Sequence, residues 1–433
     1  MKPYSAYKDT GVNWIGKLPS HWNSVRIKYS DNVIMGQSPS SDDYNLEQIG
    51  LPFLQGNADF TELHPLPRVW CSTANKIAQE GDVLLSVRAP IGAVNISDQS
   101  YGIGRGLCAI RAIKTNPKLL FYFLHAMHEE LNSNGTGSTY TAISADDVRN
   151  TFIPNIPYSE QQAIADFLDR KTAQIDTLIE KKQRQIDLLQ EQRTALINYA
   201  VTKGLDPYVT VKDAGADGID KIPSHWNIKQ LRHIIKEGTS ITYGIVQAGP
   251  DYEGGIPYIR TQDMAGSELP RQGYLRTSPE IDKSYERSKV YSGDIVIAIR
   301  ATVGKALIVP DYLNGANLTQ GTAKVSVSSA AYNRFVYYAI NSDNCQNQIS
   351  SISKGVTFRE ITLYMLRRVA IPFPPLAEQV QIADYIDKKA YEIDVAIDRV
   401  RKEIELMQEY RTALISEAVT GKIDVREWRT VHE

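Results

Sequence analysis

Several features that would settle a protein's class early are missing from this sequence. Only three cysteines occur in 433 residues, at Cys71, Cys108 and Cys345, and no two of them form a CxxC pair. This excludes a disulfide scaffold and argues against a structural zinc site. No apolar run approaches the 18 residues that a membrane span needs, and the start MKPYSAYKDTG lacks the apolar segment of a secretory signal. We therefore expect a soluble, cytoplasmic protein without a membrane partner.

An excess of one charge is missing too. Lys plus Arg number 48 and Asp plus Glu 50, so the net charge is −2 and the pI about 6.4. This balance excludes a uniformly basic, histone-like binder of nucleic acid. It leaves room for a local basic face, because the field that steers a polyanion is local.

Enzyme motifs are also absent. No GxxxxGK[ST] phosphate loop occurs, and the run Gly102-Ile-Gly104-Arg105-Gly106 lacks the acidic residue and the helix of a dinucleotide site. His125 and His128 have an HxxH spacing that could bind metal, but a solvated helix face is the interpretation we favour. The sequence therefore predicts no catalytic, cofactor-binding or metal-binding residues in this chain.

What the sequence does contain is an internal repeat of one long unit. KDTGVNWIGKLPSHWN (8–23) matches KDAGADGIDKIPSHWN (212–227) at ten of 16 positions, and residues 153–206 align with 371–424 without a gap at an offset of 218. Between these lie weaker matches: LPFLQ with IPYIR, GDVLLSVRAPIG with GDIVIAIRATVG, and GSTYTAIS with GVTFREIT. A period of about 210 residues is too long for a solenoid and predicts two homologous domains.

The repeat divides the chain as follows: an N-terminal segment (1–23) that completes the second repeat in a circular sense, a globular domain (24–152), a central helical region (153–206), a linker that repeats the N-terminal segment (207–227), a second globular domain (228–370), and a C-terminal helical region with a tail (371–433).

The two helical regions carry a near-heptad apolar stripe. In the first it runs through Ile164, Leu168, Ile175 and Leu178, and the second copy keeps the same phase. Such a stripe favours a coiled coil of helices roughly 60 Å long, with Gly204 and Gly421 as C-terminal stops. Packing of each helix on its own domain is the alternative. We expect the two helices to pair antiparallel with pseudo-twofold symmetry.

The globular domains have another pattern. Short apolar runs such as 83–87 and 295–299, separated by Gly, Pro, Asn and Asp, indicate strands and loops. Leu119–Leu131 and Tyr332–Asn344 predict one short helix in each domain. The fold class is therefore α+β, with two homologous globular domains joined by two long helices.

Polar side chains at matched places form the candidate binding surface. Arg and Gln on glycine-supported loops can approach base edges, where Arg pairs with guanine and Gln with adenine. Surface ion pairs are the alternative for Arg88 and Arg300, and His21-Trp22 and His225-Trp226 are interpreted as packing anchors. The candidate DNA-binding residues are Arg88, Arg105, Thr139, Tyr140, Thr141, Arg260, Arg300, Gln320, Thr357 and Arg359.

With these motifs in place, the chain resembles the DNA specificity subunit of a type I restriction-modification system. The resemblance is carried by PSHWN twice, by GDVLLSVRAPIG and GIGRG, and by IPxxPxxEQxxIAxxxD twice, and it covers essentially the whole chain. It implies two target-recognition domains that each read half of a split site in double-stranded DNA, and a coiled coil that acts as spacer. Asn317-Leu-Thr-Gln320-Gly321 departs from GIGRG, so readout by the second domain cannot be carried over from the first.

The resemblance also implies partners. Two methylation subunits would carry S-adenosylmethionine and restriction subunits would use ATP with Mg, while this chain, without cofactor or catalysis, positions them on DNA. The alternative is a coiled-coil scaffold that binds proteins without DNA readout, which the near-neutral charge favours slightly. The doubled arginines and the family motifs favour the first hypothesis.

Overall fold

The computed structural model describes residues 2–133, 142–216, 218–353 and 360–428. It separates into two compact units, Met1–Gln183 with Arg401–Glu433 (unit 1) and Arg184–Val400 (unit 2). The boundaries between the units fall inside the long helices α5 (Tyr158–Lys203) and α10 (Leu376–Val419). Each unit therefore contains a part of α5 and a part of α10. No helix in the described ranges is both long enough and apolar enough to cross a membrane.

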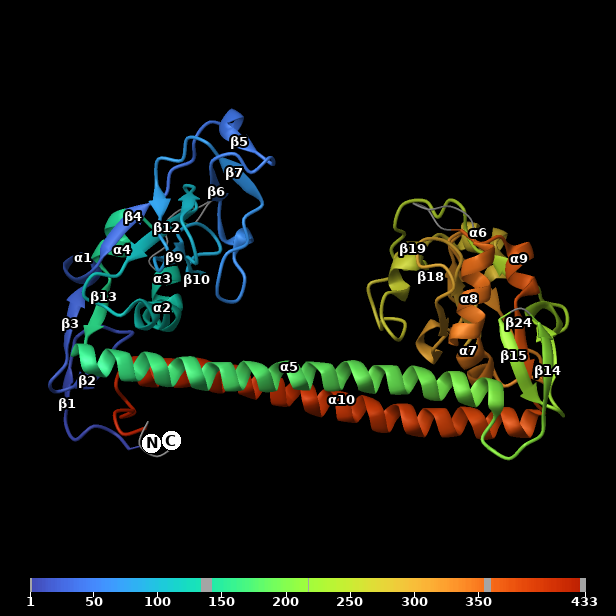
Figure 1. Ribbon diagram of the computed structural model, residues 1–433. Coiled ribbons are helices and arrows are strands. Elements are labelled where there is room, and N and C mark those ends of the chain that lie inside the picture. The colour runs from blue at the N-terminus through green and yellow to red at the C-terminus, as the bar shows by residue number, and fades with distance from the viewer. Residues whose placement is uncertain (1, 134–141, 217, 354–359, 429–433) are drawn as a thin grey trace. The chain divides into compact units, whose positions relative to one another are not determined.

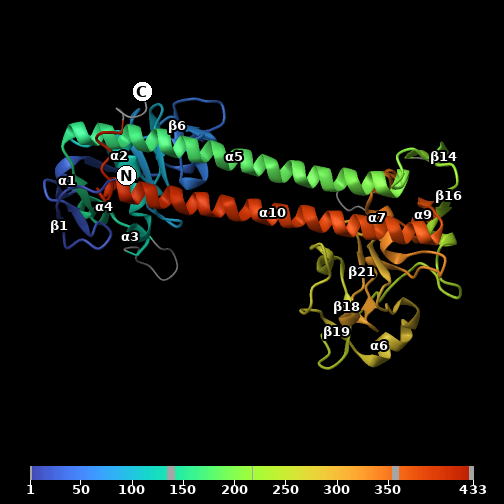
Figure 2. The ribbon, with the colours of Figure 1, turned by 90° about the horizontal axis from the view of Figure 1, so that it is seen from below.

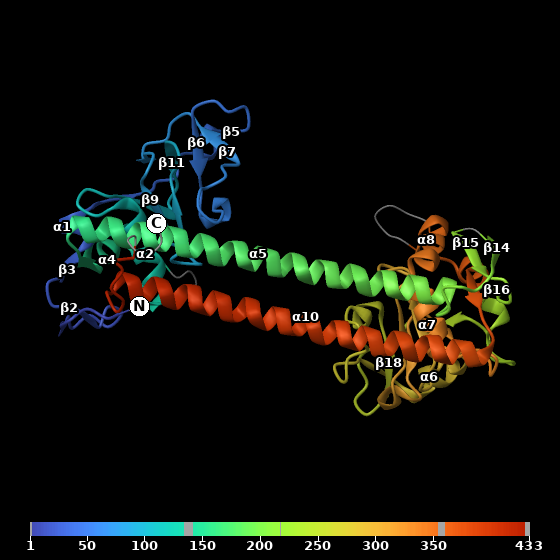
Figure 3. The ribbon, with the colours of Figure 1, turned by 60° about the horizontal axis from the view of Figure 1, so that its bottom comes forward.

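Within each unit the two long helices lie side by side and run in opposite directions (Figures 1 and 2). In unit 1 the early part of α5 meets the late part of α10, where Arg411 Nε lies 2.8 Å from Asp176 Oδ1 and Lys182 Nζ 2.6 Å from Glu403 Oε2. In unit 2 the order is reversed (Figure 3), and Arg193 pairs with Asp394 at 3.3 Å. The predicted antiparallel coiled coil is confirmed.

The seam between the helices differs from the predicted stripe at one step. Ile164, Leu168 and Ile175 are buried, but Leu178 is 47% exposed, and the neighbouring Ile179 packs against the core instead. The second copy agrees, since Ile397, at the position equivalent to Ile179, is 5% exposed. The step after Ile175 is thus four residues, because the helix must keep its apolar face on the partner.

A glycine follows the end of each long helix, as predicted, directly after α5 and two residues after α10. Gly204 and Gly421 have φ values of +76° and +66°, which a residue with a Cβ rarely adopts. A Cβ on Gly421 would lie 2.8 Å from the Trp22 ring, and one on Gly204 3.2 Å from Trp226. The two glycines therefore stop the helices and make room for the tryptophans.

The PSHWN segments pack where the two long helices meet. Trp22 and Trp226 are fully buried, which confirms them as packing anchors. Trp22 Nε1 donates to Glu160 at the start of α5 (3.2 Å), and Trp226 Nε1 donates to Glu378 at the start of α10 (3.0 Å). The N-terminal segment also reaches the end of α10, since Tyr7 Oη donates to Gly421 O at 2.9 Å.

The globular domain of unit 1 contains a four-stranded antiparallel sheet and a five-stranded sheet in which β11 runs parallel to β6. Two further antiparallel pairs complete the unit: the hairpin β1–β2, and β3 with β13, which join the start and the end of the domain. The strands are β1 (Tyr7–Asp9), β2 (Lys17–Pro19), β3 (Asn23–Arg26), β4 (Asn32–Met35), β5 (Tyr44–Asn45), β6 (Leu51–Leu54), β7 (Val69–Cys71), β8 (Ile77–Ala78), β9 (Val83–Ser86), β10 (Val94–Ile96), β11 (Tyr101–Ile103), β12 (Leu107–Arg111) and β13 (Phe152–Asn155). The sheet orders are β10-β9-β12-β4 and β5-β7-β6-β11-β8.

The globular domain of unit 2 repeats this topology. The order β17-β23-β20-β21 matches the four-stranded sheet, and β19-β18-β22, with β18 parallel to β22, matches β7-β6-β11. The strands are β14 (Val211–Ala216), β15 (Ile219–Pro223), β16 (Asn227–Gln230), β17 (Thr242–Tyr243), β18 (Ile256–Ile259), β19 (Arg276–Thr277), β20 (Ile295–Ala298), β21 (Ala306–Ile308), β22 (Asn317–Leu318), β23 (Thr322–Val325) and β24 (Ala370–Phe373). The α+β repeat predicted from the sequence is confirmed.

The short helices are more numerous than predicted. Each stretch expected to form one helix is broken in two, because Met127 and Ser342 leave the helical conformation required to continue. Further short helices precede β13 and β24. The helices besides α5 and α10 are α1 (Ile27–Ser30), α2 (Pro117–Ala126), α3 (His128–Ser133), α4 (Ala145–Asn150), α6 (Pro279–Ser284), α7 (Asn333–Asn341), α8 (Asp343–Ile352) and α9 (Leu363–Arg368).

Candidate nucleic-acid interface

The structure places Arg105 and Gln320 at equivalent positions of two tight turns. In unit 1 the turn joins β11 to β12, and Leu107 N donates to Gly104 O at 3.0 Å. In unit 2 it joins β22 to β23, and Thr322 N donates to Thr319 O at 3.2 Å. Arg105 is exposed and Gln320 half-buried. Each domain therefore presents one polar side chain from the same turn, and the two side chains differ.

The glycines around these turns have another role than the sequence suggested. We expected them to let the loops approach base edges, but they let backbone segments approach one another. A Cβ at Gly36 would lie 2.1 Å from Gly104 O, and one at Gly106 would lie 2.7 Å from Gln55 O. Gly244 in unit 2 has the same constraint, with Leu318 O at 1.9 Å. These glycines fix the turn against the neighbouring strand and so position the residue that it exposes.

A second pair of side chains lies beside the turns. Gln55 directly follows β6 and Arg260 directly follows β18, and these strands are hydrogen-bonded to the residues that begin the turns: Gly104 N donates to Leu54 O (2.8 Å) and Thr319 N to Ile259 O (3.1 Å). Sequence reasoning named Arg260 but missed Gln55, although the match of LPFLQ with IPYIR aligns the two. Each domain thus gathers one Arg and one Gln, at exchanged positions.

Arg88 and Arg300 follow the matched strands β9 and β20, as the sequence indicated, and form isolated bridges to Ala142 and Glu360. Arg88 is exposed. Arg300 Nη2 lies 3.1 Å from Glu360 Oε1 with both side chains partly exposed, so the surface ion pair that we weighed for Arg300 is formed in this structure. Thr139, Tyr140, Thr141, Thr357 and Arg359 lie outside the described residues.

The matched positions Gln55 and Arg260 differ in charge. Its guanidinium contacts Asp263 through Nε (3.0 Å) and Nη2 (2.8 Å). Hydrogen bonding to this carboxylate raises the pKa of Arg260, so its charge is fixed. In unit 1 the equivalent side chain, Gln55, is neutral, and its backbone N donates to Asp59 Oδ2 at 3.0 Å.

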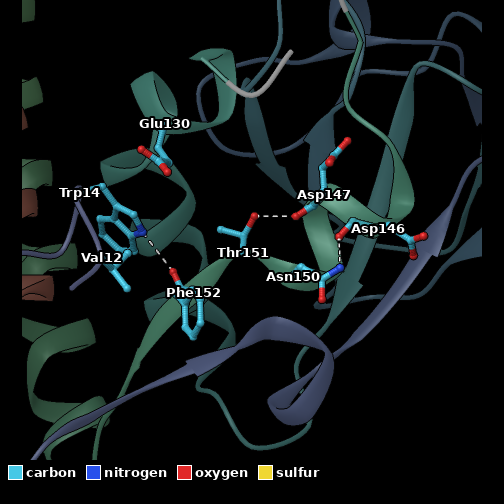
Figure 4. Close-up of a pocket in the computed structure, with 8 residues that line it drawn as sticks. All are labelled: Val12, Trp14, Glu130, Asp146, Asp147, Asn150, Thr151 and Phe152. Carbon is cyan, nitrogen blue, oxygen red and sulfur yellow. Dashed lines mark hydrogen bonds between the residues drawn. The ribbon is translucent and has the colours of Figure 1, made fainter. Parts of the chain in front are cut away.

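Unit 1 also has a pocket of about 280 Å³ (Figure 4), and its lining residues are not those of the candidate surface. Its wall includes Trp14 and Phe152, joined by a 3.1 Å hydrogen bond, and the acidic residues Glu130, Asp146 and Asp147. A lining with this charge repels phosphate, so the pocket is unsuited to nucleic acid.

The described part of the chain holds no group of three or more His, Cys, Asp or Glu side chains arranged to bind an ion. His125 packs edge-on against Phe121 with ring centroids 4.5 Å apart. The solvated helix face that we favoured holds for His128, which is exposed, and only in part for His125, which is half-buried. His128 contacts Asn132 instead, with Nε2 3.0 Å from the amide nitrogen.

Comparison with known proteins places the chain in a family. The model of the type I restriction modification DNA specificity domain matches residues 19–188 and again residues 223–406. The EcoBI specificity subunit of Escherichia coli is 23% identical over 434 residues, with 97% of this chain and 90% of that one covered. The putative MjaX specificity subunit of Methanocaldococcus jannaschii is 36% identical over 193 residues, 43% of this chain and 44% of that one.

Solved structures have the same fold. A chain from work on complex assembly and conformational transition of the type I R-M system gives a TM-score of 0.67 at 20% identity, over 94% of this chain and 99% of that one. The HsdS subunit from Thermoanaerobacter tengcongensis gives 0.52 at 19% identity, over 94% and 98%.

The chain therefore belongs to the type I restriction-modification DNA specificity family. It is a noncatalytic DNA-recognition subunit, and the comparisons do not support the protein-interaction scaffold that we kept as the alternative.

Proposed function

We propose that the chain reads a bipartite site in double-stranded DNA, with residues 24–152 reading one half-site and residues 228–370 the other. One observation carries this proposal. The two domains have the same topology, but the positions that follow β6 and β18, and those in the β11–β12 and β22–β23 turns, hold different side chains. Two domains that recognise different DNA sequences need the same backbone fold with different exposed polar side chains, and this is what the two domains have.

Arg105 is the first candidate for a base contact in the first domain. It is exposed on a turn that close backbone packing holds in place, and arginine pairs bidentately with guanine O6 and N7. Gln320 on the matched turn suits adenine N6 and N7. Arg88 would support this contact or bind phosphate, which sets register without reading sequence.

Partners supply the chemistry in this proposal. Two methylation subunits carrying S-adenosylmethionine would modify one adenine in each half-site, and restriction subunits would use ATP with Mg. The relatives named above are specificity subunits of type I restriction enzymes, which supports an assembly with such subunits. This chain would contribute the recognition of the two half-sites and the spacing between them.

The test is to assemble the purified chain with its methylation subunits and to map adenine methylation on random-sequence DNA. We expect two short specified sequences separated by a gap of fixed length and free sequence. One uninterrupted recognition sequence would overturn the proposal. The chain without its partners is the control, and methylation by a contaminant-free preparation of it would contradict its noncatalytic role.

A further inference from the structure

Arg260 is held side-on by a carboxylate from its own loop. It stands directly before the 3-10 turn η4 (Thr261–Met264), and Asp263 in that turn accepts from its Nε (3.0 Å), its Nη2 (2.8 Å) and its backbone N (2.8 Å). The Asp263 side chain is only 8% exposed and that of Arg260 23%. A buried carboxylate that accepts three hydrogen bonds cannot move easily. The plane and direction of the guanidinium are therefore set before any ligand arrives.

The outer edge of the same guanidinium is covered by a neutral acceptor. With its carboxamide oxygen turned toward Arg260, Gln262 accepts from Nη1 and Nη2, each at 2.8 Å. Gln262 is exposed, whereas Asp263 is not. One edge of the fork is therefore bonded to a group that cannot leave, and the other to a side chain that can swing into solvent.

We infer that Arg260 reads a guanine in the half-site of the second domain, with Asp263 as the positioning residue and the Gln262 carboxamide as a cap that the guanine displaces. This inference rests on the proposed function. The Nη1–Nη2 edge has the donor spacing that guanine O6 and N7 accept, and the Gln262 cap keeps these donors satisfied until the base replaces it.

The position of Arg260 supports base reading over a purely structural ion pair. Strand β18 ends beside the β22–β23 turn, where Thr319 N donates to Ile259 O at 3.1 Å, so Arg260 and Gln320 share one surface. The fixed fork suits a ligand with two acceptors, and its place beside Gln320 assigns it to a base edge, whereas a phosphate contact would act equally on all sequences. The turn η4 is closed by Asp263 N donating to Arg260 O at 3.0 Å and capped by Arg260 N donating to Asp263 Oδ2 at 2.8 Å, and a substituted side chain at position 260 keeps both bonds.

The first domain offers a matched control. At the equivalent position it has Gln55, whose backbone N donates to Asp59 Oδ2 at 3.0 Å as that of Arg260 donates to Asp263 Oδ2, but whose side chain carries no guanidinium. The fixed arginine is therefore specific to one reader. Gln55→Ala should change only the half-site of the first domain, and it should leave the guanine read by Arg260 untouched.

The experiment measures binding of the assembled complex, with its methylation subunits, to a library randomised in both half-sites. For Arg260→Ala we expect the preference for guanine at one position of one half-site to fall about 10- to 100-fold, with the other half-site unchanged. Arg260→Lys, which keeps the charge, should lose the preference nearly as far. Asp263→Asn should lower it severalfold, and Gln262→Ala should keep it with binding at least as tight.

The outcomes separate the inference from the function on which it rests. If the unsubstituted complex shows no second half-site, the proposed function fails. If both half-sites appear and Arg260→Ala leaves them unchanged, or weakens binding to all sequences equally, only the guanine assignment fails. A loss of preference in Gln262→Ala as large as in Arg260→Ala would overturn the displaceable cap. Thermal unfolding of each variant shows whether the domain has remained folded. This control matters most for Arg260→Lys, which keeps the charge.

Discussion

Tyr122 Oη donates a 2.9 Å hydrogen bond to Asp169 Oδ1, and this bond ties the first globular domain to α5. Lys118, one turn earlier on α2, pairs with the same carboxylate. Unit 2 repeats the arrangement, with Tyr338 bonded to Asp387 and Arg334 Nη2 2.7 Å from Asp387 Oδ1. The final Asp of IPxxPxxEQxxIAxxxD is therefore the residue that docks each reader on its long helix.

Removing this docking carboxylate should loosen the reader more than unfold it. Asp169→Ala leaves the Tyr122 hydroxyl with only Thr172, at 3.1 Å, and should cost about 1–3 kcal/mol of unfolding free energy. Because the domain would then tilt more freely on the helix, the complex should tolerate a wider range of gap lengths between half-sites. Methylation of substrates with gaps varied one base pair at a time measures this, and an unchanged gap preference would contradict a positioning role for Asp169.

The seam of the coiled coil predicts unequal effects at two neighbouring apolar positions. Ile175 is 8% exposed and Leu178 47%. Ile175→Ala should cost about 2–4 kcal/mol because it leaves a cavity, while Leu178→Ala should stay within about 0.5 kcal/mol. Thermal unfolding of both variants gives the comparison. Equal losses would mean that the seam runs through Leu178, as the sequence pattern alone had indicated.

These residues show how far the sequence reaches. The heptad stripe, the doubled PSHWN and the matched turns give the fold class, the antiparallel helix pair and the equivalence of Arg105 with Gln320. A one-residue phase shift in the seam is invisible to periodicity, because Leu178 and Ile179 are both apolar. The ion pair of Arg260 with Asp263 depends on the 3-10 turn between them, and the role of the glycines depends on the approach of backbone segments distant in sequence, neither of which periodicity reveals.

Acid should destabilise unit 1 through His125. Burial, aided by the charge of Arg411, lowers the pKa of His125 to about 4. The unfolded chain takes up a proton near pH 6.5 and the folded chain does not, so stability is complete above pH 6.5 and falls as the pH drops toward 4, by about 2–3 kcal/mol in total.

His125→Leu removes this titration and isolates it from the carboxylates that also respond to acid. The difference in unfolding free energy between wild type and variant should grow in favour of the variant between pH 6.5 and 4. A difference that is constant across this range would show that His125 is not the group that titrates.

The long helices should set the gap between the half-sites. Helix α5 has 46 residues and so spans about 69 Å. Inserting seven residues into both long helices, after Gln183 and after Val400, keeps the phase of the seam and adds about 10 Å. The preferred gap should lengthen by about three base pairs, with both half-site sequences unchanged. Methylation mapping measures both, and altered half-sites with the original gap would contradict this role of the helices.

The most direct test of two independent readers is to compare the Arg105→Ala and Gln320→Ala variants on one library of randomised half-sites in the assembled complex. We predict that each variant relaxes a single position, that the two positions lie in different half-sites, and that each costs about 1–3 kcal/mol of discrimination. A phosphate contact by Arg105 would instead weaken binding to all sequences and reduce the salt slope by about one. If either variant relaxes both half-sites, or if both act on the same one, the assignment of one reader to each half-site is wrong.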